Sequence, residues 1–317
     1  MTCSPGLMGT GSMAQPRPAW PSQTVRVMVP VPPGGQTDLF ARFIAEHLSK
    51  TFGQPFIIDN RPGGSGRIAM QQMLSQPADG HTILFSAASF IVVPQALNLL
   101  SPLDVTRDLA PIVQIGAGGN FLAVSSNLPV NNMRELVNYV KSSRTPLSYG
   151  SAGVGSVTHI LMAALTSSQS LEMNHVPYKS GAEVIRDMIG GVLPFGWVDT
   201  TNGGQAARAG RIRLLGVSGT FRVPGNPEVP TIAEQGFGLD QNGWFGLFAA
   251  ANTPPAVLRA INAEVLKLMS GDEARQRLHT MNVATFPPNT PEQFAETIRN
   301  DVRAWRKIVI DNQIKLD

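Results

Sequence analysis

Short apolar runs alternate with segments of helical periodicity from residue 25 onward, and this alternation limits the fold more than any other feature of the sequence. The runs at 25–31, 56–59 and 82–86 have the length of buried strands. Between them lie two stretches whose apolar residues fall on one helical face, at 39–48 and 68–74. A β-α-β-α-β order of this kind predicts a parallel sheet with helices on both faces.

The alternation restarts twice farther along the chain. Further strands are expected at 121–125, 147–150, 174–177, 192–198, 212–217 and 244–249, and helical segments at 133–140, 157–165, 185–189 and 254–269. A capping box formed by Thr290 and Gln293 opens a last helix. The pattern predicts an α/β fold of two lobes joined by crossing strands, with lobe one at 20–119 and 246–317 and lobe two at 120–245.

The helix after the first strand carries start and stop signals. Thr37 belongs to a residue type that caps helix N-termini, and Gly53 follows the last apolar position, where glycine commonly ends a helix. The sequence therefore predicts Thr37 as the N-cap and Gly53 as the stop.

Composition excludes several classes of protein. A chain of 317 residues with 43% hydrophobic and 15% charged residues is globular and long enough for two lobes. The net charge of +3, without a basic stripe, gives no electrostatic footprint for nucleic acid. Cys3 stands alone, so no disulfide within the chain and no thiolate metal site is predicted. Residues 1–19 have no apolar core of a signal peptide, and we expect them to be a processed or replaced leader outside the fold.

Motifs for catalysis are missing from the sequence. It contains no Gly-x-Ser-x-Gly elbow, no Gly-x-Gly-x-x-Gly fingerprint and no Walker loop. No acid and base are visibly paired, and no nucleophile is seen near a histidine. The five histidines lack metal-ligand spacing, and we interpret each as packed or partly exposed: His47, His81, His159, His175 and His279. These observations predict no enzyme, no cofactor and no metal.

Three turns rich in Gly and Ser lead from expected strand ends into expected helices. The first contains Gly34, Gly35, Thr37 and Asp38. Glycine lets the backbone approach a ligand closely, and the free amides at a helix start carry partial positive charge. With the Thr37 hydroxyl as a further donor, such a turn can hold a carboxylate without Arg or Lys.

The second turn spans 149–159, and the third follows the strand at 82–86. Their candidate ligand-binding residues are Ser151, Ala152, Gly153 and His159 in the second turn and Ser86 and Ser89 in the third. In open α/β sheets ligands bind beyond the carboxyl ends of strands, where all three turns fall. The alternative is that these turns are ordinary strand-to-helix connections.

Two acids allow two interpretations each. Asp38 at a helix start either favours the helix dipole or belongs to the binding site. Asp199 follows an apolar strand and either faces a cleft between the lobes or caps the next helix.

The order and spacing of these segments resemble the receptors of tripartite tricarboxylate transporters, also known as the Bug family. The likeness runs from about residue 25 to the C-terminus. It rests on the segments 29–35 with Asp38, 59–66, 79–82, 149–159, 176–181, 229–234 and 244–248. Each segment alone is weak, but their combination is specific.

The resemblance implies a periplasmic Venus-flytrap receptor of the type II kind, monomeric, with a ligand cleft between two α/β lobes. It implies that the protein binds a small carboxylate, catalyses nothing, and hands its ligand to two integral-membrane transporter subunits. Carried over by position, Gly34, Gly35, Thr37 and Asp38 of lobe one and Ser151, Ala152, Gly153 and His159 of lobe two pinch one carboxylate, with Asp199 at the far end. The segment 88–91 and Trp197 are bulkier than the family pattern, and they either shape the pocket for an apolar acid or pack in the core.

Alternatives to transport remain open at this point. A ligand-sensing adaptor for a membrane signalling protein would have the same features, and an enzyme acting on a carboxylic acid is a weaker alternative. Dicarboxylates, amino acids and aromatic acids would all suit the same turns.

Overall fold

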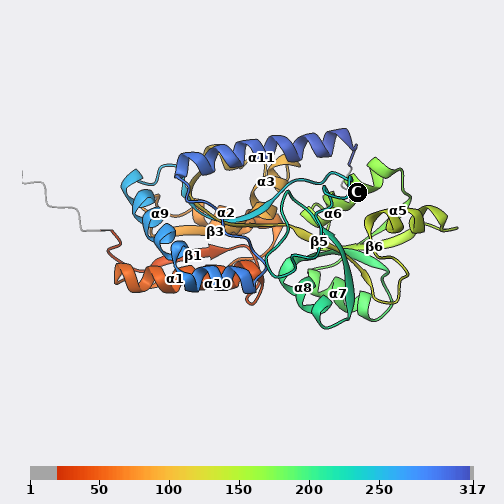
Figure 1. The fold of residues 1–317 in the computed structure, drawn as a ribbon. Helices are drawn as coiled ribbons and strands as arrows, with labels where there is room; N and C mark the ends of the chain where they lie inside the picture. Colours follow the sequence, from red (N-terminus) through yellow and green to blue (C-terminus); the bar gives the residue numbers. More distant parts are fainter. Residues whose placement is uncertain (1–19, 315–317) are drawn as a thin grey trace, which may run out of the picture.

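The computed structural model describes residues 20–314, so the interpretation of residues 1–19 as a leader lies outside the described residues. Two five-stranded sheets with helices on both faces lie side by side (Figure 1). This arrangement confirms the predicted two-lobed α/β fold.

The first sheet has the strand order β2-β1-β3-β10-β4. Its strands are β1 (Val25–Val29), β2 (Phe56–Asn60), β3 (Thr82–Ala87), β4 (Leu109–Gly118) and β10 (Gly243–Ala250). The first three are parallel, as predicted, and β10 runs antiparallel between β3 and β4. The return to this sheet begins at Gly243, close to the residue 246 expected for lobe one; the exact lobe boundary stays a prediction.

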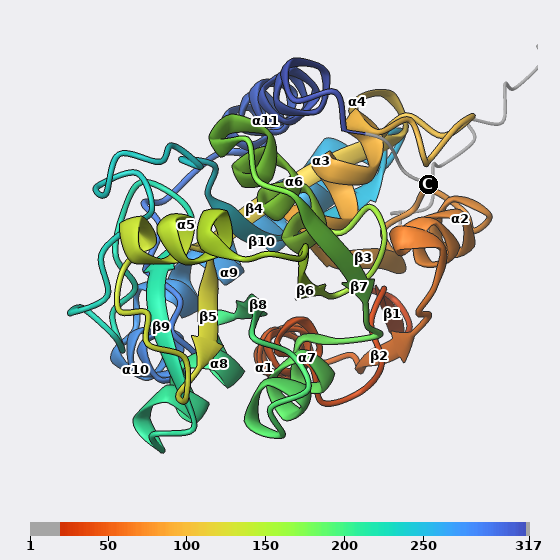
Figure 2. The same ribbon diagram turned by 90° about the vertical axis from the view of Figure 1, so that its right-hand side faces the viewer.

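The second sheet repeats this plan with the order β7-β6-β8-β5-β9. Its strands are β5 (Asn120–Ser125), β6 (Leu147–Ser151), β7 (Met173–Pro177), β8 (Phe195–Asp199) and β9 (Ile212–Val217). Here β6, β7 and β8 are parallel, and β5 is antiparallel to β8 and β9. Figure 2 shows these strands in order from β9 to β7.

Each parallel strand is followed by a helix. In lobe one these helices are α1 (Gln36–Phe52), α2 (Arg67–Leu74, after the 3-10 turn Gly64–Gly66) and α3 (Ala88–Ala96), and in lobe two α6 (Val157–Gln169), α7 (Gly181–Ile189) and α8 (Thr200–Arg208). The remaining helices are α4 (Val105–Asp108), α5 (Met133–Ser142), α9 (Pro255–Ser270), α10 (Asp272–Thr280) and α11 (Pro291–Asp311). Helix α11 packs on α3 and β4 and reaches α6 of the second lobe (Figure 1). Among the described residues no helix is long and apolar enough to cross a membrane.

The chain passes directly from β4 to β5 through Gly119. A side chain at this position would collide with the backbone oxygen of Ser218, which follows β9. The Asn120 amide donates to the Ser218 hydroxyl at 2.9 Å, so the two crossing segments touch here. Glycine is required at residue 119 because the two backbones approach so closely.

Two helix signals in the sequence are confirmed and one is wrong. Gly53 ends α1 in a left-handed conformation, and the Thr290–Gln293 capping box is present with both hydrogen bonds. Thr37 is not the N-cap. Helix α1 begins at Gln36 with Gly35 in the cap position, because Gly35 is still extended (φ −74°, ψ 162°) and the helical turn starts directly after it.

Candidate functional site

The carboxyl ends of the parallel strands in both sheets meet at one place. Gln36, at the start of α1 after β1, donates from Nε2 to the Thr201 hydroxyl in α8 at 2.6 Å. Helix α8 directly follows β8 of the second sheet. The Gly-rich turn of lobe one therefore lies against the helix starts of lobe two, which is where open α/β sheets bind ligands.

Asp38 organises the first turn. Its side chain is 1% exposed and accepts bonds from the Gly34 amide at 2.8 Å, from Arg42 at 2.9 and 3.0 Å, and from Asn60 at 2.8 Å. Burial alone would raise the pKa of this carboxyl, but the bonds from Arg42, Gly34 and Asn60 outweigh it and hold the pKa below its usual value. Asp38 is thus an ionised anchor whose acceptors are used within lobe one.

The helices that begin around this turn lack side-chain caps. The N-cap residues of α1, α2 and α3 are Gly35, Gly66 and Ala87, and none of them caps its helix with a side chain. The first amide of α2, at Arg67, donates to the Gly64 carbonyl of the preceding 3-10 turn. Thr37 is 7% exposed. Among the described residues the hydrogen bonds of this turn are donated by its neighbours Gly34 and Gln36. Several amides and one hydroxyl are therefore available as donors at the edge of the first sheet.

The third turn lies at the same edge. Ser86, near the end of the buried strand β3, is 1% exposed, and its hydroxyl has no hydrogen-bond partner among the described residues. Ser89 is half-buried in the first turn of α3. A buried hydroxyl without a partner costs free energy, so Ser86 is a donor that a ligand or a water could satisfy.

The second turn satisfies its own amides. The Ala152 amide donates to the Thr158 hydroxyl at 2.9 Å, and the Gly153 amide to the Ser151 hydroxyl at 3.2 Å. The Gly155 amide donates to Nδ1 of His159 at 3.2 Å. This turn therefore presents fewer free donors than its glycine content predicts.

Ser151 is fully buried beside a histidine that the sequence did not single out. Its Oγ lies 2.6 Å from Nε2 of His175 on the neighbouring strand β7. The expectation that no nucleophile lies near a histidine is therefore wrong, because the β6–β7 register, which the sequence does not reveal, brings the two residues together. Among the described residues no carboxylate bonds to His175, although a catalytic triad needs one to orient its base.

Three aromatic rings stack beneath this turn. The His175 ring lies 4.0 Å from the His159 ring at 6° and 5.0 Å from the Tyr149 ring at 22°. Burial lowers the pKa of His159, and burial together with His159 lowers the pKa of His175 to about 4. Burial raises the pKa of Tyr149 to about 12, so the whole stack is neutral at neutral pH.

Asp199 caps α8. Its carboxylate accepts from the Asn202 amide at 2.8 Å and from the Asn202 side chain at 3.0 Å. The structure thus supports the capping interpretation of the two that the sequence allowed.

A buried contact made by Asn282 joins the lobes, close to the segments that cross from one lobe to the other. Asn282, after α10, is 1% exposed, and its Nδ2 donates to the Thr200 carbonyl at 2.9 Å and to Asn226 Oδ1 at 2.8 Å. A side chain on Gly225 would collide with the Asn282 amide, so the cradle in lobe two fits this residue closely. The Thr201 hydroxyl also donates to the Met281 carbonyl at 2.7 Å. None of these contacts was expected from sequence, because they join residues 56 to 82 positions apart.

Comparison with known proteins identifies the family. The family model described as "Tripartite tricarboxylate transporter family receptor" matches residues 40–314. The chain belongs to this receptor family.

The receptor also has relatives and solved neighbours over nearly its whole length. It is 27% identical to protein BugT of Bordetella pertussis, covering 98% of this chain and 96% of BugT. The structure of an R. palustris protein with adipate superposes with a TM-score of 0.85 at 29% identity, covering 93% of this chain and 99% of that one. MatC from Rhodopseudomonas palustris with bound malate superposes with a TM-score of 0.82 at 27% identity, covering 92% and 100%. The Bug-family resemblance and the two-lobed binding-protein fold are both confirmed.

The bulky residues of this receptor lie in its core. Trp197 is fully buried in a hydrophobic cluster that also holds Ala88 and Ile91. Of the two interpretations, the structure supports core packing for Trp197, Ala88 and Ile91. Phe90 of the same segment is half-buried on the opposite side, against the cluster that contains α1.

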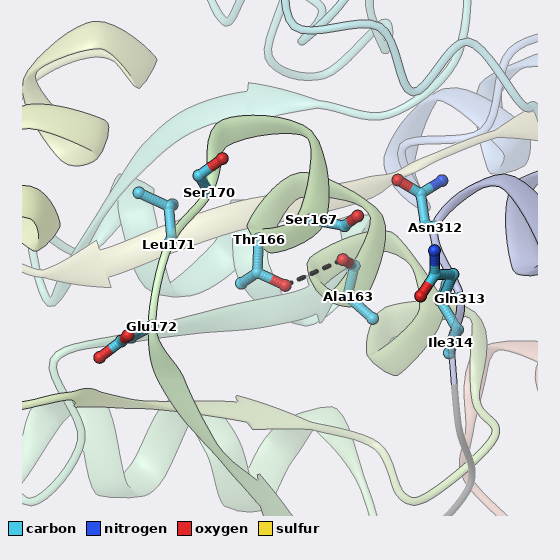
Figure 3. A pocket seen from close by; sticks show the side chains of 9 residues that line it. All are labelled: Ala163, Thr166, Ser167, Ser170, Leu171, Glu172, Asn312, Gln313 and Ile314. Atoms are coloured by element: carbon cyan, nitrogen blue, oxygen red, sulfur yellow. Dashed lines mark hydrogen bonds between the residues drawn. The ribbon is translucent and has the colours of Figure 1, made fainter.

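A shallow hollow between α6 and α11 lies apart from the predicted site. It is lined by side chains from the ends of both helices, namely Ala163, Thr166, Ser167, Ser170, Leu171, Glu172, Asn312, Gln313 and Ile314 (Figure 3). None of the predicted ligand-binding residues lines it. Among the described residues of the receptor no group of three or more metal-ligating side chains is present.

Proposed function

We propose that this receptor captures a small carboxylate between its lobes in the periplasm and delivers it to a membrane transporter of the tripartite tricarboxylate type. The observation that carries the proposal is the set of uncapped helices α1, α2 and α3 at the carboxyl edge of the first sheet. Uncapped N-termini of this kind attract anions because their amides are unpaired and the helix dipole is positive there.

The donors proposed in lobe one are the first-turn amides of α1 and the hydroxyls of Thr37, Ser86 and Ser89. Gly34 and Gly35 are exposed and let the ligand approach, whereas Asp38 fixes the shape of their turn. In lobe two the turn that contains Ser151, Ala152, Gly153 and His159 closes over the ligand, and Asp199 sets the start of α8 beside it.

The energetics suit a receptor. A hydrogen bond to a charged group contributes about 1.5–3 kcal/mol net. Four such bonds, less the cost of ordering the two lobes, are compatible with micromolar or tighter binding. The two structural neighbours with adipate and malate support a carboxylate ligand, and a dicarboxylate, an amino acid or an aromatic acid fits the same set of donors.

A thermal-shift panel tests the ligand class. Bound ligand raises stability by mass action, by about 2.7 kcal/mol at a hundred times its Kd. Some small carboxylic acids should therefore raise the Tm, whereas their amides and neutral sugars should not. Stabilisation by sugars with no response to any acid would contradict the proposal.

Two further measurements test closure and delivery. Solution scattering should show a smaller radius of gyration with the stabilising acid, because the lobes rotate together about the crossing segments. Ligand-loaded receptor should capture the two integral-membrane transporter subunits from detergent-solubilised membranes. Recovery of a membrane signalling protein in their place would favour a sensing adaptor.

A further inference from the structure

The second Gly-rich turn depends on a chain of hydrogen bonds that ends at His175. The Ser151 hydroxyl has one proton and lies 2.6 Å from Nε2 of His175 and 3.2 Å from the Gly153 carbonyl oxygen, either of which can accept it. We assign the proton to the histidine because that contact is the shorter of the two. The hydroxyl oxygen is then the acceptor for the Gly153 amide at 3.2 Å. The order from Gly153 N–H through Ser151 O–H to His175 Nε2 is cooperative, since each bond polarises the next.

The neighbouring histidine holds the same turn at a second point. His159 accepts from the Gly155 amide through Nδ1 and stacks face to face on His175 at 4.0 Å. Two amides of the turn, at Gly153 and Gly155, therefore depend on two imidazoles in one stack. An imidazole accepts a hydrogen bond only in its neutral form, because a protonated histidine carries a proton on both nitrogens.

The surroundings of His175 favour the neutral form. The elements packed on β7 are β6 and α6, and the described residues of all three contain no Asp, Glu, Lys or Arg. The titratable groups that face His175 are therefore His159 and Tyr149. Burial, with His159 adding repulsion, accordingly lowers the pKa of His175 to about 4.

We infer that His175 is a positioning residue of the binding site, which acts through Ser151 and the His159 ring to hold the second turn in the shape that closes on ligand. The inference deepens the proposed function and rests on it for its effect on affinity. It assigns the Ser151 hydroxyl to the protein's own network instead of to the ligand.

The lowered pKa of His175 makes the stability of the protein depend on pH. An unfolded histidine has a pKa of about 6.5, so the unfolded chain binds the proton first as the pH falls. The contribution of His175 to stability is therefore fully present above pH 6.5 and is lost as the pH falls toward 4. Protonation of the folded protein below that range should release the turn.

Hydrogen exchange in the ligand-free protein tests the positioning role directly. His175→Phe keeps a ring in the stack but has no acceptor, whereas the amide oxygen of His175→Gln can accept from Ser151. The peptide 150–156 should exchange about tenfold faster in the Phe variant and near the wild-type rate in the Gln variant. His47→Phe, on α1, is the control and should leave this peptide unchanged. Unchanged exchange in His175→Phe, or equal acceleration in both His175 variants, would overturn the inference.

A double-mutant cycle tests the path through Ser151. With an acid that stabilises the wild type, Ser151→Ala and His175→Phe should each weaken binding about tenfold by calorimetry. The double variant should be no weaker than the worse single variant, because both substitutions break one chain of bonds. A loss of affinity of about a hundredfold in the double variant would contradict a path through Ser151. If the wild type binds no carboxylic acid, the proposed function fails, and the exchange experiment still decides the role of His175.

Discussion

The two lobes share one sheet plan, but their helices begin in opposite ways. In lobe two the helices that follow the parallel strands are all capped by side chains, namely α6 by Ser156, α7 by Ser180 and α8 by Asp199. In lobe one the three equivalent helices have Gly35, Gly66 and Ala87 in the N-cap position, and no side chain caps them. Lobe two therefore satisfies its own helix amides, whereas lobe one leaves its amides for another acceptor.

The two Gly-rich turns are also held by opposite chemistry. An ionised carboxylate, Asp38, fixes the first turn, while neutral imidazoles, His159 and His175, fix the second. Both devices order the backbone without placing a cation in the site. We propose from this difference that lobe one holds the anion and that lobe two closes over it as an already ordered surface. The predictions below are ordered by the expected change in the free energy of unfolding of the ligand-free protein.

The largest effect is expected from Asp38→Ala, which removes the anchor of the first turn. The substitution leaves the Gly34 amide, the Asn60 amide and Arg42 without their acceptor, and breaking a buried ion pair costs about 3–5 kcal/mol. Because the Arg42 side chain is 49% exposed, we expect a loss of about 3 kcal/mol in urea denaturation. Asp272→Ala, at a carboxylate that is 97% exposed, is the matched control and should change stability by less than about 0.5 kcal/mol. A loss below about 1 kcal/mol for Asp38→Ala would show that the carboxylate does not anchor the turn.

Asn282→Ala should cost about 2 kcal/mol, because it breaks the contact through which the contrasting lobes are joined. The variant loses two buried hydrogen bonds, to Thr200 and Asn226, and leaves a gap in a closely fitting cradle, where Asn226 Oδ1 keeps only the longer bond from Arg208 at 3.4 Å. The same denaturation series measures the loss. Asn312→Ala, which removes a side-chain bond within α11, is the control and should cost much less. Equal losses of stability in the two variants would mean that the buried Asn282 contact does not stabilise the junction between the lobes.

Asp199→Ala should cost about 1 kcal/mol, the usual value for removing an N-cap. The change frees the Asn202 amide at the start of α8 and makes one lobe-two helix resemble those of lobe one. Ligand affinity should change little if Asp199 only caps the helix. A large loss of affinity with unchanged stability would instead assign the carboxylate to the ligand.

The parallel halves of both sheets and the return of the chain to lobe one were predictable, but the position of the returning strand within its sheet was not. Runs such as 56–59 and 82–86 alternate with amphipathic segments, and this order predicts strands parallel to the first one, at 25–31. Strand β10 inserts between β3 and β4 from more than 100 residues away, and an apolar run carries no information about its partner. Helix α8 was missed because it begins Thr200-Thr201-Asn202-Gly203-Gly204, which are poor helix formers, and the Asp199 cap offsets that weakness.

The candidate site shows the same limit. The Gly-rich turns were located by sequence, since glycine and hydroxyl residues between a strand and a helix have few other arrangements. Which amides stay free depends on side chains that approach from other elements. The bond from Ser151 to His175 requires the β6–β7 register, and the bridge from Gln36 to Thr201 requires the placement of the lobes. Neither is encoded in local pattern.

The smallest change in stability, and the sharpest test of the contrast between the lobes, is expected from giving lobe one a cap. Gly35 has an extended backbone that any residue adopts, and the atoms nearest to an added side-chain carbon lie 3.9 Å away. Gly35→Ser should therefore cap α1 without strain and raise the free energy of unfolding by a few tenths of a kcal/mol. The serine hydroxyl would accept a hydrogen bond from an amide that we assign to the ligand, so the affinity for the acid should fall about tenfold. Gly35→Ala has the same backbone effect without a cap and should bind nearly as the wild type does. Calorimetric titration and urea denaturation of both variants separate the effects, and equal affinity in the Ser and Ala variants would show that the free amides of α1 do not hold the anion.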